Sequence, residues 1–161
     1  MWLDVPARAA VHHLKYGGWS RVAEPMARLM GRLEPLTHPG ILVPIPLAAR
    51  RARSRGFNQA ERLATALGQC ARMPVRADVL ARQRETPTQT ALVPEARRAN
   101  VADAFHASGV AAGARLVLVD DVFTTGATLA EAAAALLEAG AGTVDAVTFA
   151  RARPAVHEAS C

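Results

Sequence analysis

The sequence of 161 residues predicts an α/β fold in which a parallel sheet is flanked by helices. Two observations carry this prediction. A strand–helix–strand pattern runs from Leu116 to Phe149, and a second apolar run, Ile41 to Ile45, is short and bounded by proline. Short apolar runs separated by helical stretches are typical of parallel strands joined by crossover helices, and such sheets bind ligands at the carboxyl ends of their strands.

Two helices are expected before the first strand. Apolar residues recur at helical spacing from Val5 to Lys15, and the glycine pair at 17–18 is a typical helix end. Ser20 can cap a second helix, in which Pro25 falls near the first turn or kinks the helix. The residues expected on the buried face of this second helix are Val22, Met26, Leu29 and Met30.

The middle of the chain continues the alternation of strands and helices. A helix is expected from Phe57 to Leu67, just after Gly56, with Phe57 in the core, and a further strand is expected from Val75 to Leu80. Residues 82–100 are polar, contain two prolines and lack sustained periodicity. A loop of that length inside a compact domain is usually functional or disordered.

The last third of the chain predicts one β-α-β unit. Leu116 to Val119 suits a strand buried on both faces, because every residue in it is apolar. Ala127 to Ala139 suits a helix that stops at Gly140, and Thr143 to Phe149 suits the next strand. The two strands should be parallel.

Composition narrows the class of protein. The formal net charge of +5 is uneven, because residues 1–100 contain 16 Lys and Arg against 7 Asp and Glu, whereas residues 101–161 contain 3 against 7. All the basic residues except Lys15 are arginines, which suit bidentate phosphate contacts; an exposed basic face is the alternative interpretation. No apolar run approaches the roughly 18 residues of a membrane span, and no signal peptide is evident. Cys70 and Cys161 indicate neither a disulfide framework nor a zinc site, so we expect a cytoplasmic protein.

The most informative segment joins the strand Leu116 to Val119 to the helix that follows. Asp120 and Asp121 end the strand, and a turn rich in hydroxyl groups opens the helix. Helix N-termini bind anions through backbone N–H groups, and carboxylates accept hydrogen bonds from sugar hydroxyls, so one ligand that fits both is a ribose 5-phosphate. If the acids only capped a turn, the hydroxyl-rich turn would stay unexplained. The residues expected around the phosphate are Thr124, Thr125, Gly126, Ala127 and Thr128.

Other phosphate-binding motifs are absent from the sequence. It contains neither a G-x-x-x-x-G-K-[ST] loop nor a G-x-G-x-x-G turn at a first strand, so an ATP-hydrolysing P-loop and a dinucleotide-binding fold are not supported.

The motifs resemble those of known families. Val117 to Thr128 is similar to the phosphoribosyl pyrophosphate (PRPP) binding motif of type I phosphoribosyltransferases. Further segments resemble the signature of the competence-associated ComF family, and together they cover most of the chain from about residue 12 to residue 150. These segments are Val43-Pro44-Ile45-Pro46-Leu47, Arg55-Gly56-Phe57-Asn58-Gln59-Ala60, Arg84 to Leu92 and, more weakly, Leu14-Lys15-Tyr16-Gly17.

The resemblance implies a type I phosphoribosyltransferase-like, Rossmann-like parallel sheet with a small hood. We expect one domain over residues 1–161, with a core at about 41–150 and a hood formed mainly by residues 1–40 and the C-terminal tail. Members of the ComF family commonly begin with a cysteine-rich zinc module, which this sequence lacks, either naturally or by truncation. No role of that module can be carried over.

The resemblance also assigns three groups of residues: catalytic acids that hold the ribose hydroxyls, residues that bind pyrophosphate, and residues of a mobile loop that closes over PRPP. The catalytic acids are Asp120 and Asp121. The pyrophosphate-binding residues are Pro46, Leu47, Arg53 and Arg55. The mobile-loop residues are Arg84, Thr86 and Gln89. The expected cofactor is Mg²⁺, bound through PRPP near the two acids and not directly by the protein.

Three functions are compatible with these assignments. The leading hypothesis is a phosphoribosyltransferase that transfers a phosphoribosyl group from PRPP to an unidentified acceptor, expected to be a nitrogenous base, with a link to DNA uptake. The second is a non-catalytic PRPP or nucleotide sensor among DNA-uptake proteins. The third is a single-stranded DNA-binding module, which the aromatic content of 4% disfavours because few rings can stack on bases. Whether the chain forms a homodimer is left open.

Overall fold

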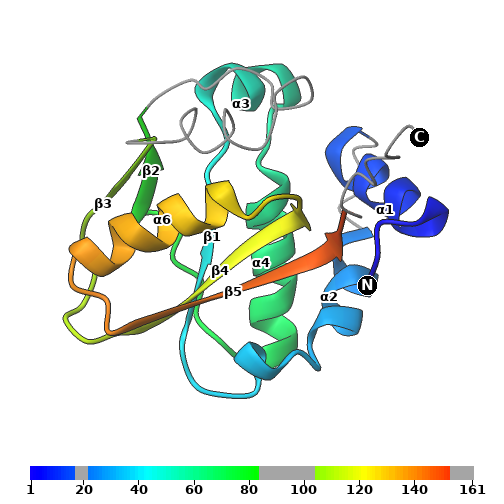
Figure 1. Ribbon diagram of the computed structural model, residues 1–161. Helices are drawn as coiled ribbons and strands as arrows, with labels where there is room; N and C mark the ends of the chain where they lie inside the picture. The colour runs from blue at the N-terminus through cyan, green and yellow to red at the C-terminus, as the bar shows by residue number, and fades with distance from the viewer. Residues whose placement is uncertain (17–21, 84–103, 153–161) are drawn as a thin grey trace, which may run out of the picture.

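The computed structural model describes residues 1–16, 22–83 and 104–152. At its centre is a parallel sheet of three strands in the order β1-β4-β5, and a separate antiparallel pair joins β2 to β3 (Figure 1). The α/β class and the parallel β-α-β unit are therefore confirmed. The strands are β1 (Ile41–Pro44), β2 (Leu80–Arg82), β3 (Phe105–Ala107), β4 (Arg115–Phe123) and β5 (Thr143–Arg151).

Helices cover both faces of the parallel sheet. One core lies beneath α1, α2 and α4, and the other lies beneath α6 and the small antiparallel pair. In Figure 1, α6 crosses in front of the sheet and α4 runs behind it. The helices are α1 (Val5–Tyr16), α2 (Ala23–Met30), α3 (Ala49–Arg55), α4 (Gln59–Ala71) and α6 (Ala127–Glu138), with one 3-10 turn, η2 (Glu34–Leu36).

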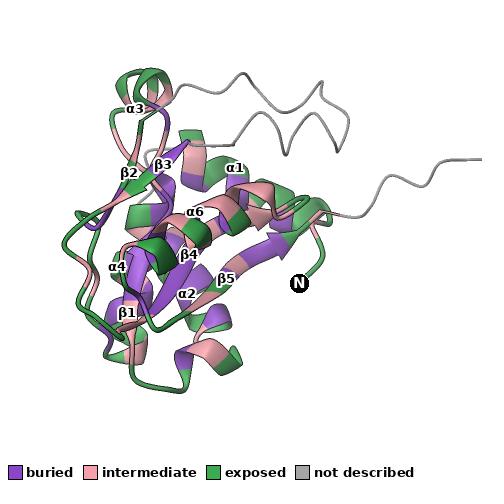
Figure 2. Cartoon of the chain, turned by 60° about the vertical axis from the view of Figure 1, so that its left-hand side comes forward, coloured by how far each residue is buried: buried purple, intermediate pink, exposed green. Residues whose placement is uncertain are grey.

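The alternation of side chains along β4 builds the two cores. Leu116 and Leu118 pack into the core beneath α6, whereas Val117 and Val119 pack into the core beneath α1, α2 and α4. All four are buried, which explains why the run contains no polar residue (Figure 2). The prediction of a strand buried on both faces is confirmed.

The strand β4 continues beyond its expected end at Val119. Asp120 stays in register with Thr148 of β5, and Val122 stays in register with Ala150. The two carboxylates therefore lie within the strand, near its carboxyl end, rather than after it.

One expectation for the middle of the chain is wrong, and one helix there was not predicted. Val75 makes only a single bridge to Leu42, and β2 begins at Leu80, because the chain turns between them at a bidentate ion pair. In that pair Arg76 Nε and Nη2 lie 2.7 Å from the two carboxylate oxygens of Asp78. The arginine-rich segment after β1 forms the helix α3, which the sequence did not predict.

Some side chains of the helices also lie elsewhere than predicted. Leu29 is 63% exposed, because α2 packs on α4 through its other apolar residues. Phe57 is half-buried outside both cores, and the Arg62 guanidinium lies 3.6 Å from the centre of its ring. Pro25 lies in the first turn of α2, as expected, whereas Ser20 and the glycine pair at 17–18 fall outside the described residues.

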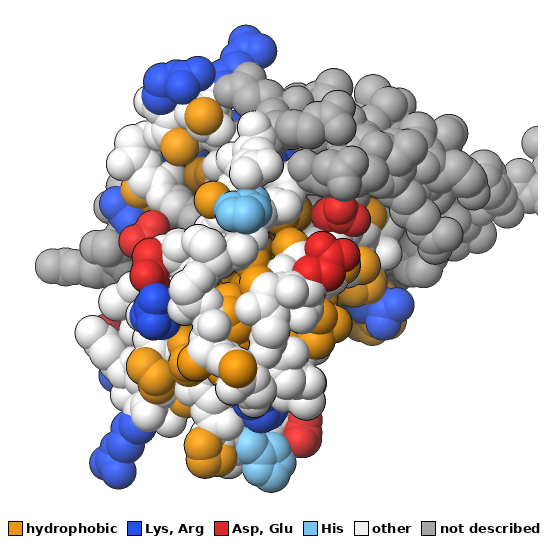
Figure 3. All heavy atoms as spheres, turned by 90° about the vertical axis from the view of Figure 1, so that its left-hand side faces the viewer, with side chains coloured by type: hydrophobic (Ala, Val, Ile, Leu, Met, Phe, Trp, Pro, Cys, Tyr) orange, Lys and Arg blue, Asp and Glu red, His pale blue; other side chains and the backbone are white. Residues whose placement is uncertain are grey.

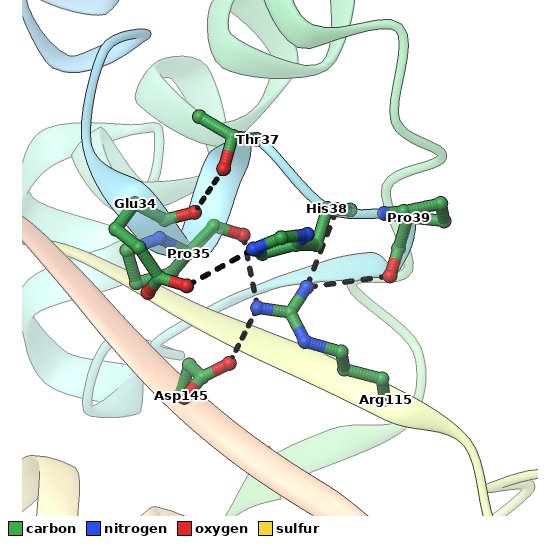
Figure 4. A network of polar contacts seen from close by, with 7 residues as sticks. All are labelled: Glu34, Pro35, Thr37, His38, Pro39, Arg115 and Asp145. Atoms are coloured by element: carbon green, nitrogen blue, oxygen red, sulfur yellow. Dashed lines mark hydrogen bonds and ion pairs between the residues drawn. The ribbon is translucent and has the colours of Figure 1, made fainter.

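A polar network anchors the turn after α2 to the sheet (Figure 4). The guanidinium of Arg115, at the start of β4, donates to the Asp145 carboxylate at 2.6 Å and to three backbone carbonyls. The carbonyl oxygens belong to Pro35, at 3.1 Å, and to His38 and Pro39, both at 3.3 Å. One side chain thus holds the chain segment between α2 and β1 against β4 and β5. Within the described residues, no helix is long and apolar enough to cross a membrane.

We predict that Arg115→Met lowers the free energy of unfolding by about 1–3 kcal/mol, because it leaves the partly buried Pro35 carbonyl and the Asp145 carboxylate without their shared donor. Urea unfolding followed by circular dichroism measures this change. Arg28→Met is the matched control, since Arg28 pairs only with the exposed Glu24 on the surface of α2 and should change stability little. Equal effects of the two substitutions would contradict the anchoring role of Arg115.

Candidate functional site

The carboxyl ends of β1 and β4 lie side by side. The two strands are parallel with Pro44 opposite Val119, and the N–H of Ile45 donates to the Val119 carbonyl at 3.0 Å. The chain that leaves β1 through Pro46 and Leu47 therefore emerges next to the acids of β4. Figure 1 shows α3, which follows these residues, at the same edge of the sheet.

The turn after β4 leaves the N-terminus of α6 open to an anion. Gly126 adopts a φ of +79° at the N-cap, and as a glycine it has no side chain to bond the N–H groups of the first helical turn. A Cβ on Gly126 would lie 2.9 Å from the Phe123 ring. The Ala127 N–H makes a long contact of 3.4 Å with the Thr125 hydroxyl, and the first turn contains no acidic residue. Free N–H groups and the helix dipole both favour a phosphate at this position.

The side chains of the two neighbouring acids have different surroundings. Asp121 continues the row of Val117 and Val119, on the face covered by α1 and α4. It is only 4% exposed, with Lys15 Nζ of α1 2.6 Å from its Oδ2 and Gln59 Nε2 of α4 3.5 Å from its Oδ1. Asp121 Oδ2 therefore forms an ion pair with Lys15, and Asp121 Oδ1 makes a long contact with Gln59.

Asp120 is half-buried and continues the other row of β4. Its Oδ1 accepts the Asp121 N–H at 2.8 Å. Desolvation and the adjacent Asp121 carboxylate raise the pKa of Asp120 well above its ordinary value, and Lys15 only partly opposes this. The fold thus opposes the ionisation of Asp120.

The guanidinium of Arg82 lies close enough to interact with the Asp120 carboxylate and with the Arg51 guanidinium. Arg82, at the end of β2, lies 5.2 Å from the Phe105 ring and is half-buried. Its burial and the guanidinium of Arg51 in α3 lower the pKa of Arg82, whereas the Asp120 carboxylate raises it. The sequence did not single out Arg82, because it stands at the border of a polar stretch and its nearness to Asp120 arises only from the fold.

The predicted pyrophosphate residues Arg53 and Arg55 occupy different positions. Arg53 is exposed on α3, at the end of the molecule where Figure 3 shows basic side chains projecting. Arg55 is half-buried, and its Nη1 donates to Gln59 Oε1 at 3.0 Å while its Nη2 donates to the Tyr16 hydroxyl at 3.0 Å. Arg55 therefore supports the residue that contacts Asp121.

The remaining predicted residues divide into two sets. Thr124 and Thr125 are exposed in the turn, with Ala127 and Thr128 half-buried behind them at the start of α6. The loop residues fall outside the described part of the chain, so their predicted roles stay predictions: Arg84, Thr86 and Gln89.

A divalent cation fits this site if most of its oxygen ligands come from phosphates and water. Within the described residues, no three His, Cys, Asp or Glu side chains gather to bind a metal ion. Asp120 offers one carboxylate beside guanidinium groups, whereas Mg²⁺ bound with a polyphosphate takes most of its oxygen ligands from the phosphates and from water. The donor set suits a Mg²⁺ that arrives with its substrate.

Comparison with known proteins defines the class. The phosphoribosyl transferase domain family matches residues 53–159, so the chain belongs to that family. Among solved structures, the allosteric regulatory enzyme of purine biosynthesis aligns with a TM-score of 0.50 at 20% identity, over 86% of this chain and 30% of that one. The shared fold is that of the phosphoribosyltransferases.

Sequence relatives place the chain in the ComF group of this class, as the motifs predicted. The DNA utilization protein YhgH of Escherichia coli O157:H7 is 36% identical over 86% of this chain, and the chain spans 64% of the length of that relative. Competence protein F of Haemophilus influenzae is 30% identical over 91% of this chain and 69% of its own. Competence protein ComFC of Bacillus subtilis is 38% identical over 69% of this chain and 44% of its own.

We predict that Gly126→Ala destabilises the protein more than Gly113→Ala does. Both glycines have a positive φ, for which an alanine costs roughly 1–2 kcal/mol, but only at Gly126 would the new Cβ meet another residue, the Phe123 ring. Gly113, where nothing lies within 4 Å of the added carbon, is therefore the matched control. Chemical unfolding of both variants measures the difference, and equal losses would show that the Phe123 ring moves away without cost.

We predict that Asp120→Asn stabilises the fold at neutral pH. The raised pKa of Asp120 means that the folded protein holds this proton more tightly than the unfolded chain, so wild-type stability falls as the pH rises from about 4 through the folded-state pKa. The asparagine variant lacks this loss and should equal wild type at about pH 3. Urea unfolding across this pH range tests the prediction.

Asp78→Asn is the control, because it should change stability at neutral pH in the opposite direction. The hydrogen bond from Arg76 lowers the pKa of Asp78, so this carboxylate contributes stability that disappears as the pH falls. A neutral-pH gain for Asp78→Asn, or none for Asp120→Asn, would contradict the assignment of the two environments.

Proposed function

We propose that this protein binds PRPP with Mg²⁺ at the carboxyl edge of its sheet and transfers the phosphoribosyl group to a nitrogenous base, with release of pyrophosphate. The observation that carries the proposal is one juxtaposition. The open N-terminus of α6 follows β4, the arginine-rich α3 follows the neighbouring β1, and the acids of β4 lie between them. A ligand with phosphates at both ends of a ribose matches this order of groups.

The turn after β4 binds the 5-phosphate in this proposal. Backbone N–H groups of the first turn of α6 point toward the anion, and the hydroxyls of Thr124, Thr125 and Thr128 add donors. Gly126 gives the turn its left-handed conformation. The same geometry keeps other side chains away from the phosphate.

Asp120 holds the ribose hydroxyls. It is the acid with an oxygen not engaged by Lys15 or Gln59, and it stands between the phosphate turn and the arginines. A carboxylate there also opposes the positive charge that grows on the ribose ring as the bond from its anomeric carbon to pyrophosphate breaks.

The segment after β1 binds the pyrophosphate. The Leu47 N–H follows Pro46 in a stiff connection, and stiff backbone donors bind an anion at a small entropic cost. The guanidinium groups of Arg51, Arg53 and Arg82 then stabilise the negative charge on the leaving group, a charge that Mg²⁺ also neutralises when it is bound. Arg55 acts indirectly, through Gln59.

We further propose that this chemistry serves the use of DNA taken up by the cell. Relatives of this chain include a DNA utilization protein and two competence proteins. A phosphoribosyltransferase in that setting would convert bases released from DNA into nucleotides.

The test combines calorimetry with product detection. We expect wild type to bind Mg-PRPP and to release pyrophosphate when one of a panel of purine and pyrimidine bases is added. Asp120→Asn should weaken PRPP binding by about 1.5–3 kcal/mol, the usual contribution of a hydrogen bond to a charged group, while the fold stays intact. Arg28→Met, which breaks an exposed ion pair on α2, is the control that should bind like wild type.

Other outcomes would replace this proposal. Tight PRPP binding without pyrophosphate release for any base would favour a sensor of PRPP or nucleotides. Single-stranded DNA binding that falls steeply with salt and is lost in Arg50→Gln with Arg53→Gln, in a protein that does not bind PRPP, would favour a DNA-binding module. Unchanged PRPP affinity in folded Asp120→Asn would overturn the assignment of the sugar site.

A further inference from the structure

The most constrained polar group in the described part of the chain is the Asp121 carboxylate. Only two polar residues there are buried, Asp121 and Gln59, and they contact each other. An ionised carboxylate removed from water requires a positive partner, because desolvation otherwise strongly disfavours its charge. Lys15 supplies that partner, with 2.6 Å between its Nζ and Asp121 Oδ2.

A chain of contacts connects this ion pair back to the same helix. Gln59 Nε2 lies 3.5 Å from Asp121 Oδ1, Gln59 Oε1 accepts from Arg55, and Arg55 donates to the hydroxyl of Tyr16. The Arg55 guanidinium also lies 4.9 Å from the centre of the Tyr16 ring. Since Lys15 and Tyr16 are adjacent in the last turn of α1, the contacts form a closed ring that joins α1, β4, α4 and the end of α3.

We propose that Lys15 is a positioning residue for the sugar site: by neutralising Asp121, it leaves Asp120 as the single net negative charge that faces the ribose. This inference rests on the proposed function. Lys15 does not act on the phosphates directly in this arrangement, because its side chain is only 24% exposed and its ammonium group pairs with Asp121. The ion pair thus gives the two adjacent acids different roles: Asp121 supports the structure of the site, and Asp120 binds the ribose.

Loss of Lys15 alone would change the site electrostatically. Asp121 would become a buried, uncompensated carboxylate directly beside Asp120, and the two would repel each other. Asp120 would then share a proton with its neighbour or turn away from it, and either change removes a good acceptor for the ribose hydroxyls. Removing the charge of Asp121 at the same time should remove the repulsion.

The experiment is therefore a double-mutant cycle on Mg-PRPP binding, measured by calorimetry with melting temperatures recorded for each variant. We expect Lys15→Met to weaken binding by about tenfold or more, and Lys15→Met with Asp121→Asn to bind within about threefold of wild type. Lys15→Arg, which keeps the positive charge, should bind more tightly than Lys15→Met. Arg28→Met, which breaks an exposed pair on the adjacent helix, should bind like wild type.

The outcomes separate the two proposals. Wild type that does not bind Mg-PRPP would overturn the proposed function. Wild type that binds, with folded Lys15→Met binding equally well, would overturn the role of Lys15. A double variant as weak as Lys15→Met would show that Lys15 or Asp121 contacts the ligand itself, which also overturns it. If Lys15→Met does not fold, the charge-neutral double variant decides, and its failure to fold or to bind would count against the proposal.

Discussion

The positions of α1 and α4 at the carboxyl end of β4 depend on one buried charge. Asp121 lies near the end of β4, on the face that Val117 and Val119 line, and a carboxylate buried there persists only if a cation and a hydrogen-bond donor reach it. Lys15 and Gln59 do so from two different helices, which fixes the end of α1 and the start of α4 against the carboxyl end of β4. The apolar packing beneath α1, α2 and α4 holds the helices on the sheet, and the ion pair sets where along the strand α1 ends.

The neighbouring acid, Asp120, lacks such stabilisation of its charge, and in the proposed function a ligand supplies it. Asp120 is partly desolvated and stands beside another carboxylate, so its ionised form is unfavourable in the empty protein. A ligand that brings hydroxyl donors and a magnesium ion would supply the stabilisation that the fold withholds. Such sites commonly reduce stability where they bind, because the groups that contact a ligand cannot also be satisfied internally.

The success of the sequence predictions follows from the kind of signal behind each element. The β-α-β unit and the helix after Gly56 rest on apolar periodicity, which core packing enforces, and the structure confirms them. Helix α3 has no apolar stripe, so its alanines and arginines indicated only a basic segment. The strand expected at Val75 was interrupted by the Arg76–Asp78 pair, a local contact that periodicity does not reveal. The contact between Lys15 and Asp121 joins residues more than a hundred positions apart in the sequence, and no spacing rule predicts it.

The Arg115 network and the ion pair between Lys15 and Asp121 lie toward opposite ends of β4. Arg115 begins β4 and binds the segment before β1, whereas Asp121, near the other end of the same strand, binds α1. One strand therefore contacts the described residues of the N-terminal segment, 1–16 and 22–40, at two points, which at roughly 3.3 Å per residue lie about 20 Å apart. Contacts at two such points hold the described parts of this segment against the sheet. In the proposed reaction, the acceptor would therefore be selected by exclusion against a preformed wall, with little entropy lost on binding.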